Sequence, residues 1–178
     1  MIITHVEPIP IHVPLKQGLT TKTAHGEHIT SPYVIVKVYT DEDLVGLGEA
    51  TLSPRWSGET SRGCVAVIED ILSPALEGHD PTNISAAREI ISGAIKLNPF
   101  TKAAVEMALW DIKGKATGLP VYKLLGGPLR NKVVCYTHCD DSKNTEKLIQ
   151  SCVRKVEQGW KFLRWSQPET GDKNVDGI

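Results

Sequence analysis

The feature of the sequence that most limits the possible folds is a single β-α-β unit near its end, over residues 132–166. A short buried strand is expected at residues 132–137, an amphipathic helix at 144–158 and a second strand at 162–165. A crossover helix of this length joins two parallel strands of one sheet. Parallel sheets are covered on both faces, so two parallel strands do not form a stable sheet alone. The unit is therefore expected to open a larger α/β domain.

The first fifty residues follow a different pattern, which predicts a small antiparallel sheet. Apolar residues alternate over residues 1–15, and the prolines among them favour an edge strand. The segments 33–40 and 44–50 are rich in β-branched residues and predict a hairpin. The polar segments 16–30 and 51–60 are expected to be loops.

Helical spacing begins after residue 60. It predicts helices at residues 65–76 and 84–95, and then a long helix that Asn98 caps and Pro99 opens. Gly118 is expected to end this long helix. Residues 1–130 therefore predict one α+β domain, and residues 131–178 the incomplete start of a second domain.

Charge and composition exclude several classes of function. The chain has 178 residues, with 20 Lys+Arg against 21 Asp+Glu, so it lacks the basic excess of proteins that neutralise nucleic-acid phosphates. No segment approaches the ~18 consecutive apolar residues of a membrane span, and the N-terminus does not resemble a signal peptide. The four cysteines form neither a disulfide framework nor a zinc pair. We therefore expect no nucleic-acid or membrane partner, reduced thiols and a cytoplasmic location.

One stretch resembles a known family. It reads ALWDIKGK at residues 108–115, followed at fixed gaps by Pro120-Val121 and Leu124-Leu125-Gly126. This is similar to the signature of the mandelate racemase/muconate lactonizing enzyme group of the enolase superfamily, and Gly48-Glu49-Ala50 also resembles that group. The resemblance implies an α+β capping domain over residues 1–130 and the first βαβ of a truncated (β/α)₇β TIM-like barrel over 131–178. A barrel of this kind runs ~250 residues, so only its first two strands fit here.

The resemblance also implies a chemistry, the removal of a proton next to a carboxylate while Mg²⁺ stabilises the enediolate. The metal-binding carboxylates of the family lie on later barrel strands, so no residue of this chain is assigned as a metal ligand. Arg164 stands where many members carry Lys-x-Lys, and it resembles the arginine of the mannonate dehydratase subgroup, which assists a nearby tyrosine. His138, in the segment Tyr136-Thr137-His138, is similar to a histidine that lies near the substrate in that subgroup.

Arg164 and His138 are therefore the catalytic candidates, but the general base is left unassigned. In the subgroup the tyrosine follows the arginine by about a dozen positions, and residues 166–178 contain no tyrosine. The alternatives are a surface Arg164 paired with Glu169 or Asp172, and a solvated His138 beside acidic neighbours.

By position, the two polar segments match the capping-domain loops that close the active site in this family. Their candidates for substrate binding are His25, His28, Arg55 and Trp56. The function expected is that of a Mg²⁺-dependent acid-sugar dehydratase, with this chain as an N-terminal part that is inactive alone. The alternatives are a racemase, epimerase or cycloisomerase of the same superfamily, or a non-catalytic fragment or pseudoenzyme completed by another chain. Homo-oligomers are common in the family, so one is expected here.

Overall fold

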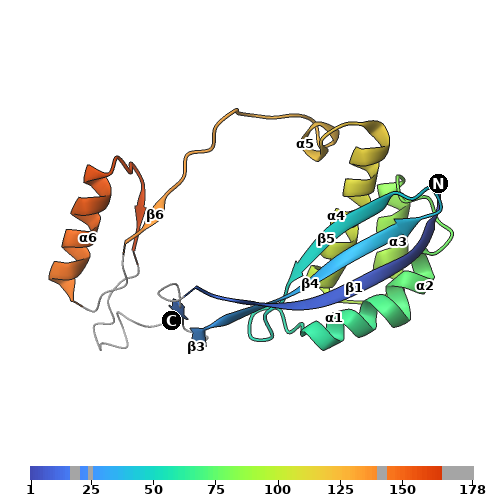
Figure 1. Ribbon diagram of the computed structural model, residues 1–178, viewed down its shortest axis with the longest axis horizontal. Helices are drawn as coiled ribbons and strands as arrows, with labels where there is room; N and C mark the ends of the chain where they lie inside the picture. The colour runs from blue at the N-terminus through green and yellow to red at the C-terminus, as the bar shows by residue number, and fades with distance from the viewer. Residues whose placement is uncertain (17–20, 24–25, 140–143, 166–178) are drawn as a thin grey trace. The chain divides into compact units, whose positions relative to one another are not determined.

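The computed structural model describes residues 1–16, 21–23, 26–139 and 144–165. The chain divides into two compact units, Met1–Gly127 and Pro128–Ile178 (Figure 1). Each unit is described by itself. None of the helices in the described ranges is long and apolar enough to cross a membrane.

The first unit is built on a three-stranded antiparallel sheet. Its strands are β1 (Ile3–Pro14), β4 (Thr30–Thr40) and β5 (Val45–Thr51), in the order β1-β4-β5. This confirms the predicted hairpin, and it places the proline-containing β1 at an edge, where a missing N–H costs least. One expectation is wrong, because residues 16–30 are not all loop. They contain the short antiparallel pair β2 (Thr21–Thr23) and β3 (Gly26–His28), which is too short for apolar alternation to reveal.

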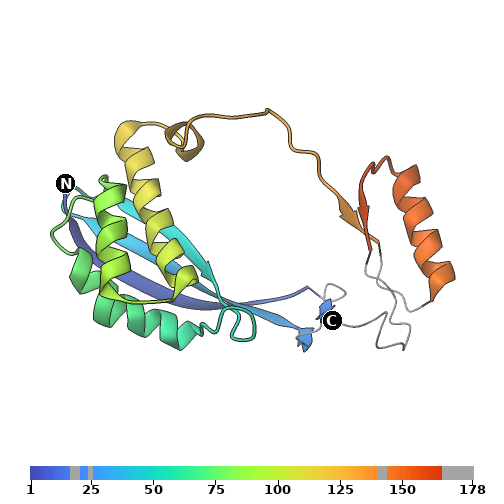
Figure 2. The same cartoon turned by 180° about the vertical axis from the view of Figure 1, so that it is seen from behind.

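Helices cover one face of this sheet, as the two opposite views show (Figures 1 and 2). They are α1 (Ser61–Val67), the π-helical turn η1 (Ile68–Leu72), α2 (Ser73–Leu76), α3 (Ile84–Ala94) and α4 (Pro99–Thr117). The short helix α5 (Val121–Leu124) follows α4 and contacts it. Every second residue of the central strand, Val34, Val36 and Val38, is completely buried. The core opposite them consists mainly of α4 residues and of the predicted stripe at every fourth position, Ile68, Leu72 and Leu76. The apolar residues that alternate along β4 and those that recur at helical spacing after residue 60 thus pack together in one core.

Strand β5 and helix α4 lie in direct backbone contact. A methyl group at Gly48 would overlap the carbonyl oxygen of Ala104, and one at Gly46 would overlap the carbonyl oxygen of Ala108. Two glycines spaced by two on the strand therefore face two alanines spaced by four on the helix. This close approach explains why small residues recur in both segments.

The N-terminus of α4 corrects one prediction. Asn98 does not cap the helix with its side chain: its backbone is left-handed (φ 53°, ψ 50°), and its amide donates to the carbonyl of Lys96. The cap comes from Glu59, a buried residue 41 positions before Phe100. Its carboxylate accepts the N–H groups of Phe100 and Thr101, each at 2.9 Å, and the Thr101 hydroxyl at 2.7 Å. A negative charge here also complements the positive end of the helix.

The second unit contains β6 (Thr137–His138), α6 (Thr145–Glu157) and β7 (Leu163–Arg164), with the two strands parallel as predicted. The expectation of a buried strand over residues 132–137 is wrong for this chain. Val133 and Val134 are 74% and 72% exposed, and the apolar face of α6 is also largely open. An apolar strand is buried only when neighbours cover both its faces, and nothing in the described part of the chain does so here. The described part of this unit is thus a single β-α-β unit with strands shorter than predicted.

Candidate functional site

Two of the residues predicted for the site, His138 and Arg164, lie side by side at the ends of β6 and β7. The parallel ladder pairs them directly, with Thr137 opposite Leu163 one step earlier. The N–H of Cys139 donates to the carbonyl oxygen of Arg164 at 2.8 Å, which closes the ladder just beyond the pair. The backbone hydrogen bonds of the strand pair therefore hold these two residues next to each other.

The alternation of side chains along β6 fixes the face on which they lie. Cys139 is 1% exposed, and its sulfur contacts that of Cys152 on α6, so Cys139 points toward the helix. Neighbouring strand residues point to opposite faces, so His138 lies on the face away from α6. Arg164 shares the register of His138 and lies on the same face, and both side chains are exposed. Figure 2 shows α6 against one side of the strand pair only.

A third side chain completes this group. Tyr136, two residues before His138, accepts a hydrogen bond from Nη1 of Arg164 at 3.2 Å, and the guanidinium carbon lies 5.9 Å from the tyrosine ring centre. The rings of Tyr136 and His138 are 6.2 Å apart at an angle of 56°. We call these three residues the Arg–Tyr–His cluster. It brings together a permanent positive charge, a phenol and an imidazole, which can bind an anion and move protons.

The cluster does not supply a magnesium site. Mg²⁺ prefers oxygen ligands, usually carboxylates, and the cluster contains none. Among the residues the structure describes, no group of three or more His, Cys, Asp or Glu side chains is placed to hold a metal ion. The buried carboxylate of Glu59 is already engaged at the start of α4. The described residues therefore do not fit the metal that the family implies.

The substrate-binding candidates belong to the first unit. Arg55 and Trp56 lie in a tight turn in which the N–H groups of Trp56 and Ser57 both donate to the carbonyl of Ser53, at 3.0 and 2.8 Å. Trp56 is 76% exposed at this turn. His25 lies outside the described residues, and His28 ends strand β3. Glu169 and Asp172, the alternative partners of Arg164, also lie outside them.

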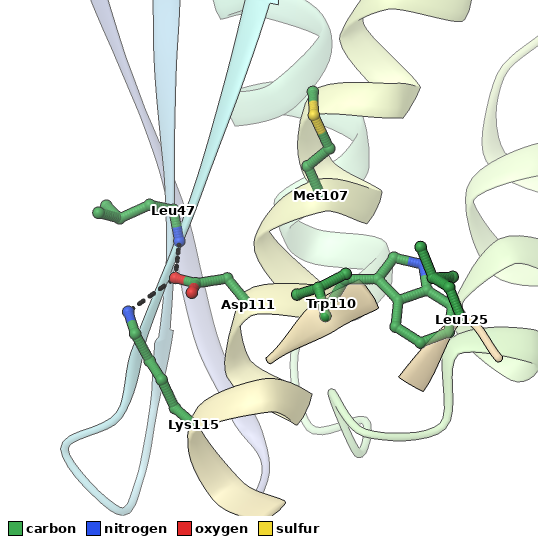
Figure 3. A pocket seen from close by; sticks show the side chains of 7 residues that line it. Leu47, Met107, Trp110, Asp111, Lys115 and Leu125 are labelled. Atoms are coloured by element: carbon green, nitrogen blue, oxygen red, sulfur yellow. Dashed lines mark hydrogen bonds and ion pairs between the residues drawn. The ribbon is translucent and has the colours of Figure 1, made fainter. Parts of the chain in front are cut away.

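The first unit has an open apolar groove of about 600 Å³ between β5, α4 and α5 (Figure 3). Its polar groups are engaged with one another: the Asp111 carboxylate accepts the Leu47 N–H at 2.9 Å and the Lys115 ammonium at 2.7 Å. Lys115 also donates to the carbonyl of Val45. These contacts tie α4 to β5, so we assign Asp111 and Lys115 a structural role.

An antiparallel sheet with helices on one face, followed by a parallel β-α-β unit, is the arrangement expected of a capping domain and the first strands of a barrel. Comparison with known proteins agrees with this. Residues 2–126 match the model for the mandelate racemase / muconate lactonizing enzyme N-terminal domain. The chain therefore belongs to the mandelate racemase/muconate lactonizing enzyme group of the enolase superfamily and contains its N-terminal part.

Individual relatives differ in the reactions their names describe. The chain is 35% identical to a D-galactonate dehydratase family member, RspA, of Halomonas elongata, over 92% of this chain and 40% of the relative. It is 37% identical to a chloromuconate cycloisomerase of Cupriavidus pinatubonensis, over 89% of this chain and 42% of the relative. A similar solved structure is the dipeptide epimerase of Enterococcus faecalis with Mg and the dipeptide L-Leu-L-Tyr. It has a TM-score of 0.80 and 31% identity, over 94% of this chain and 46% of the epimerase. The chain thus spans less than half the length of these relatives.

Proposed function

We propose that this chain is the N-terminal part of a Mg²⁺-dependent acid-sugar dehydratase. The observation that carries the proposal is the Arg–Tyr–His cluster on the face of β6 and β7 that α6 leaves open. In capped barrels the active site lies at the carboxyl ends of the barrel strands, and His138 and Arg164 stand at two such ends. The relatives named as dehydratases support the choice of reaction.

In this proposal the enzyme removes the proton next to a sugar-acid carboxylate and expels the neighbouring hydroxyl as water. Arg164 is permanently charged, so it is a poor base but a good partner for a carboxylate or for the oxygen of Tyr136. Tyr136 and His138 are the two groups of the cluster that can accept or donate a proton. The metal ligands would come from later barrel strands, which this chain does not contain.

The capping domain would supply substrate contacts. We propose that His25, Arg55 and Trp56 help to cover a small, polar acid-sugar substrate, because loops of this kind exclude water and orient substrates. Glu59 follows the turn of Arg55 and Trp56 and donates its N–H to the Ser57 hydroxyl at 3.3 Å, while its carboxylate anchors the start of α4. This would hold the turn on a rigid support.

A racemase, epimerase or cycloisomerase is the competing proposal, supported by the names of other relatives. The sequence at the end of β7 disfavours it. Residues 164–166 read Arg-Trp-Ser, so both lysines of the Lys-x-Lys pattern are absent. An arginine cannot replace a lysine that must accept a proton.

The test is the substitution Arg164→Lys, assayed in the native-length protein with Mg²⁺ and a panel of aldonic and aldaric acids. Lysine keeps the positive charge but lacks the planar guanidinium group with its several N–H donors. We therefore expect kcat/KM for water loss to fall by about 10²-fold or more. Formation of the keto acid product is followed by NMR. Arg62→Lys, at an exposed position on α1, is the matched control and should keep the native rate. An unchanged rate in Arg164→Lys, or epimerisation without water loss in the native protein, would refute the proposal.

A further inference from the structure

Two cysteine thiols meet where β6 and α6 pack together. The sulfur atoms of Cys139 and Cys152 are 3.0 Å apart, although the residues are 13 positions apart in sequence. All four cysteines of the chain lie in the described ranges, and none forms a disulfide. The contact is separate from the side chains of the Arg–Tyr–His cluster, because Cys139 faces α6 and the cluster lies on the opposite face of the strands.

Both sulfur positions are set by backbone structure. The N–H of Cys139 donates to the carbonyl of Arg164, which fixes the end of β6. The side chain of Asn144 accepts the N–H of Lys147 and caps α6, so Cys152 follows two helical turns later on the face toward the strands. Cys139 is almost fully buried and Cys152 is partly exposed. Cys152 is therefore the more accessible residue of the pair, and the sulfur of Cys139 lies within 3.0 Å of its sulfur.

The other two cysteines lack this arrangement. Cys64 is buried in the core of the first unit, and this burial raises the pKa of its thiol, which disfavours the reactive thiolate. Cys135 is exposed, and its Sγ lies 3.7 Å from the carbonyl oxygen of Val133. Each of them is a natural control for the Cys139–Cys152 pair.

We propose that Cys139 and Cys152 form a reversible redox pair that closes to a disulfide when it meets a small disulfide oxidant, such as oxidised glutathione. The thiolate of Cys152 attacks one sulfur of the oxidant, forms a mixed disulfide and releases one thiolate. The thiolate of Cys139 then attacks the sulfur of Cys152 and releases the second. The two cysteines lose two electrons and two protons, and the oxidant becomes two thiols. The bond requires the two sulfurs to approach by about 1 Å from their present distance.

The disulfide would act on the strand ends that carry the cluster. His138 immediately precedes Cys139, and Arg164 accepts the N–H of Cys139. A covalent bond from Cys139 to α6 therefore ties the ends of both strands to the helix. In the reduced chain no covalent bond joins Cys139 to α6.

The experiment exposes the 178-residue chain and the native-length protein to glutathione buffers of increasing oxidised fraction. Remaining thiols are trapped with an alkylating reagent, and peptides are mapped by mass spectrometry. We expect Cys139 and Cys152 to lose their thiols together, with the 139–152 cross-link about ten-fold or more above any cross-link to Cys135. Excess reduced glutathione should restore both thiols.

Two variants make the test decisive. Cys135→Ser should leave the 139–152 cross-link unchanged, and Cys152→Ser should abolish it while Cys139 stays a thiol. Cys139→Ala, which should leave Cys152 carrying one glutathione, replaces Cys152→Ser if the latter fails to fold by circular dichroism. Glutathione on Cys135 alone in the wild-type chain, or a cross-link that joins Cys135 to either partner, would overturn the proposal.

Discussion

Replacing Gly48 by alanine is expected to lower the free energy of unfolding of the first unit by about 3 kcal/mol, or to prevent its folding. The added methyl group would overlap the carbonyl oxygen of Ala104, which is part of the α4 backbone and cannot rotate away. The strand and the helix would have to separate, and this separation would open the core where Val36 and Leu109 are completely buried. Urea unfolding, followed by circular dichroism and by tryptophan fluorescence, measures the loss.

Gly93→Ala is the matched control for this substitution. Gly93 lies in α3, and a methyl group there would meet nothing within 4 Å. Alanine also favours a helix over glycine, so this variant should be unchanged or more stable by about 0.5 kcal/mol. Equal stability of the Gly48 and Gly93 variants would show that β5 and α4 are not in backbone contact.

The second large effect is expected for Glu59, whose carboxylate caps α4. Glu59→Ala leaves the N–H groups of Phe100 and Thr101 and the Thr101 hydroxyl without their acceptor, in a site where Thr101 is completely buried. We expect a loss of about 3 kcal/mol in the free energy of unfolding. Glu59→Gln keeps one acceptor oxygen but turns an NH₂ donor toward other donors, so its loss should be about 2 kcal/mol.

Glu89→Gln, an exposed substitution on α3, serves as the control for Glu59→Gln and should change stability by less than about 0.5 kcal/mol. Urea unfolding of the four proteins in parallel separates the loss of the cap from a general effect of charge. A Glu59→Ala protein as stable as the wild type would mean that α4 is capped in another way.

Much of the first unit could be predicted from local pattern. Val34, Val36 and Val38 alternate along their strand, and Ile68, Leu72 and Leu76 recur at every fourth position. All six residues are completely buried. The cap of α4 could not be predicted, because Asn98 offered a plausible local cap and the true partner, Glu59, is about forty residues away. The buried strand expected at residues 132–137 was predicted wrongly for a different reason. Its apolar side chains are suited to neighbouring strands that this chain does not contain.

In the candidate site, too, some residues were predicted from the sequence and one was missed. Arg164 and His138 were predicted because they resemble residues of the mannonate dehydratase subgroup, and the parallel register brings them together. Whether they act in catalysis stays a prediction. A tyrosine beside Arg164 was sought in the residues that follow it, whereas Tyr136 lies 28 positions earlier and reaches the arginine across the two strands. The spacing of Tyr136 and His138, two residues apart on one strand, is the sequence signal that could have found it.

We propose that this chain provides substrate-facing and proton-moving groups, and that the magnesium ligands belong to the remainder of the barrel. The most direct measurement is loss of water from sugar acids in the presence of Mg²⁺, with the 178-residue chain and the native-length protein in parallel assays. The claim predicts Mg²⁺-dependent turnover by the native-length protein and none by the 178-residue chain. Turnover by the 178-residue chain alone, or no turnover of any sugar acid by the native-length protein, would contradict it.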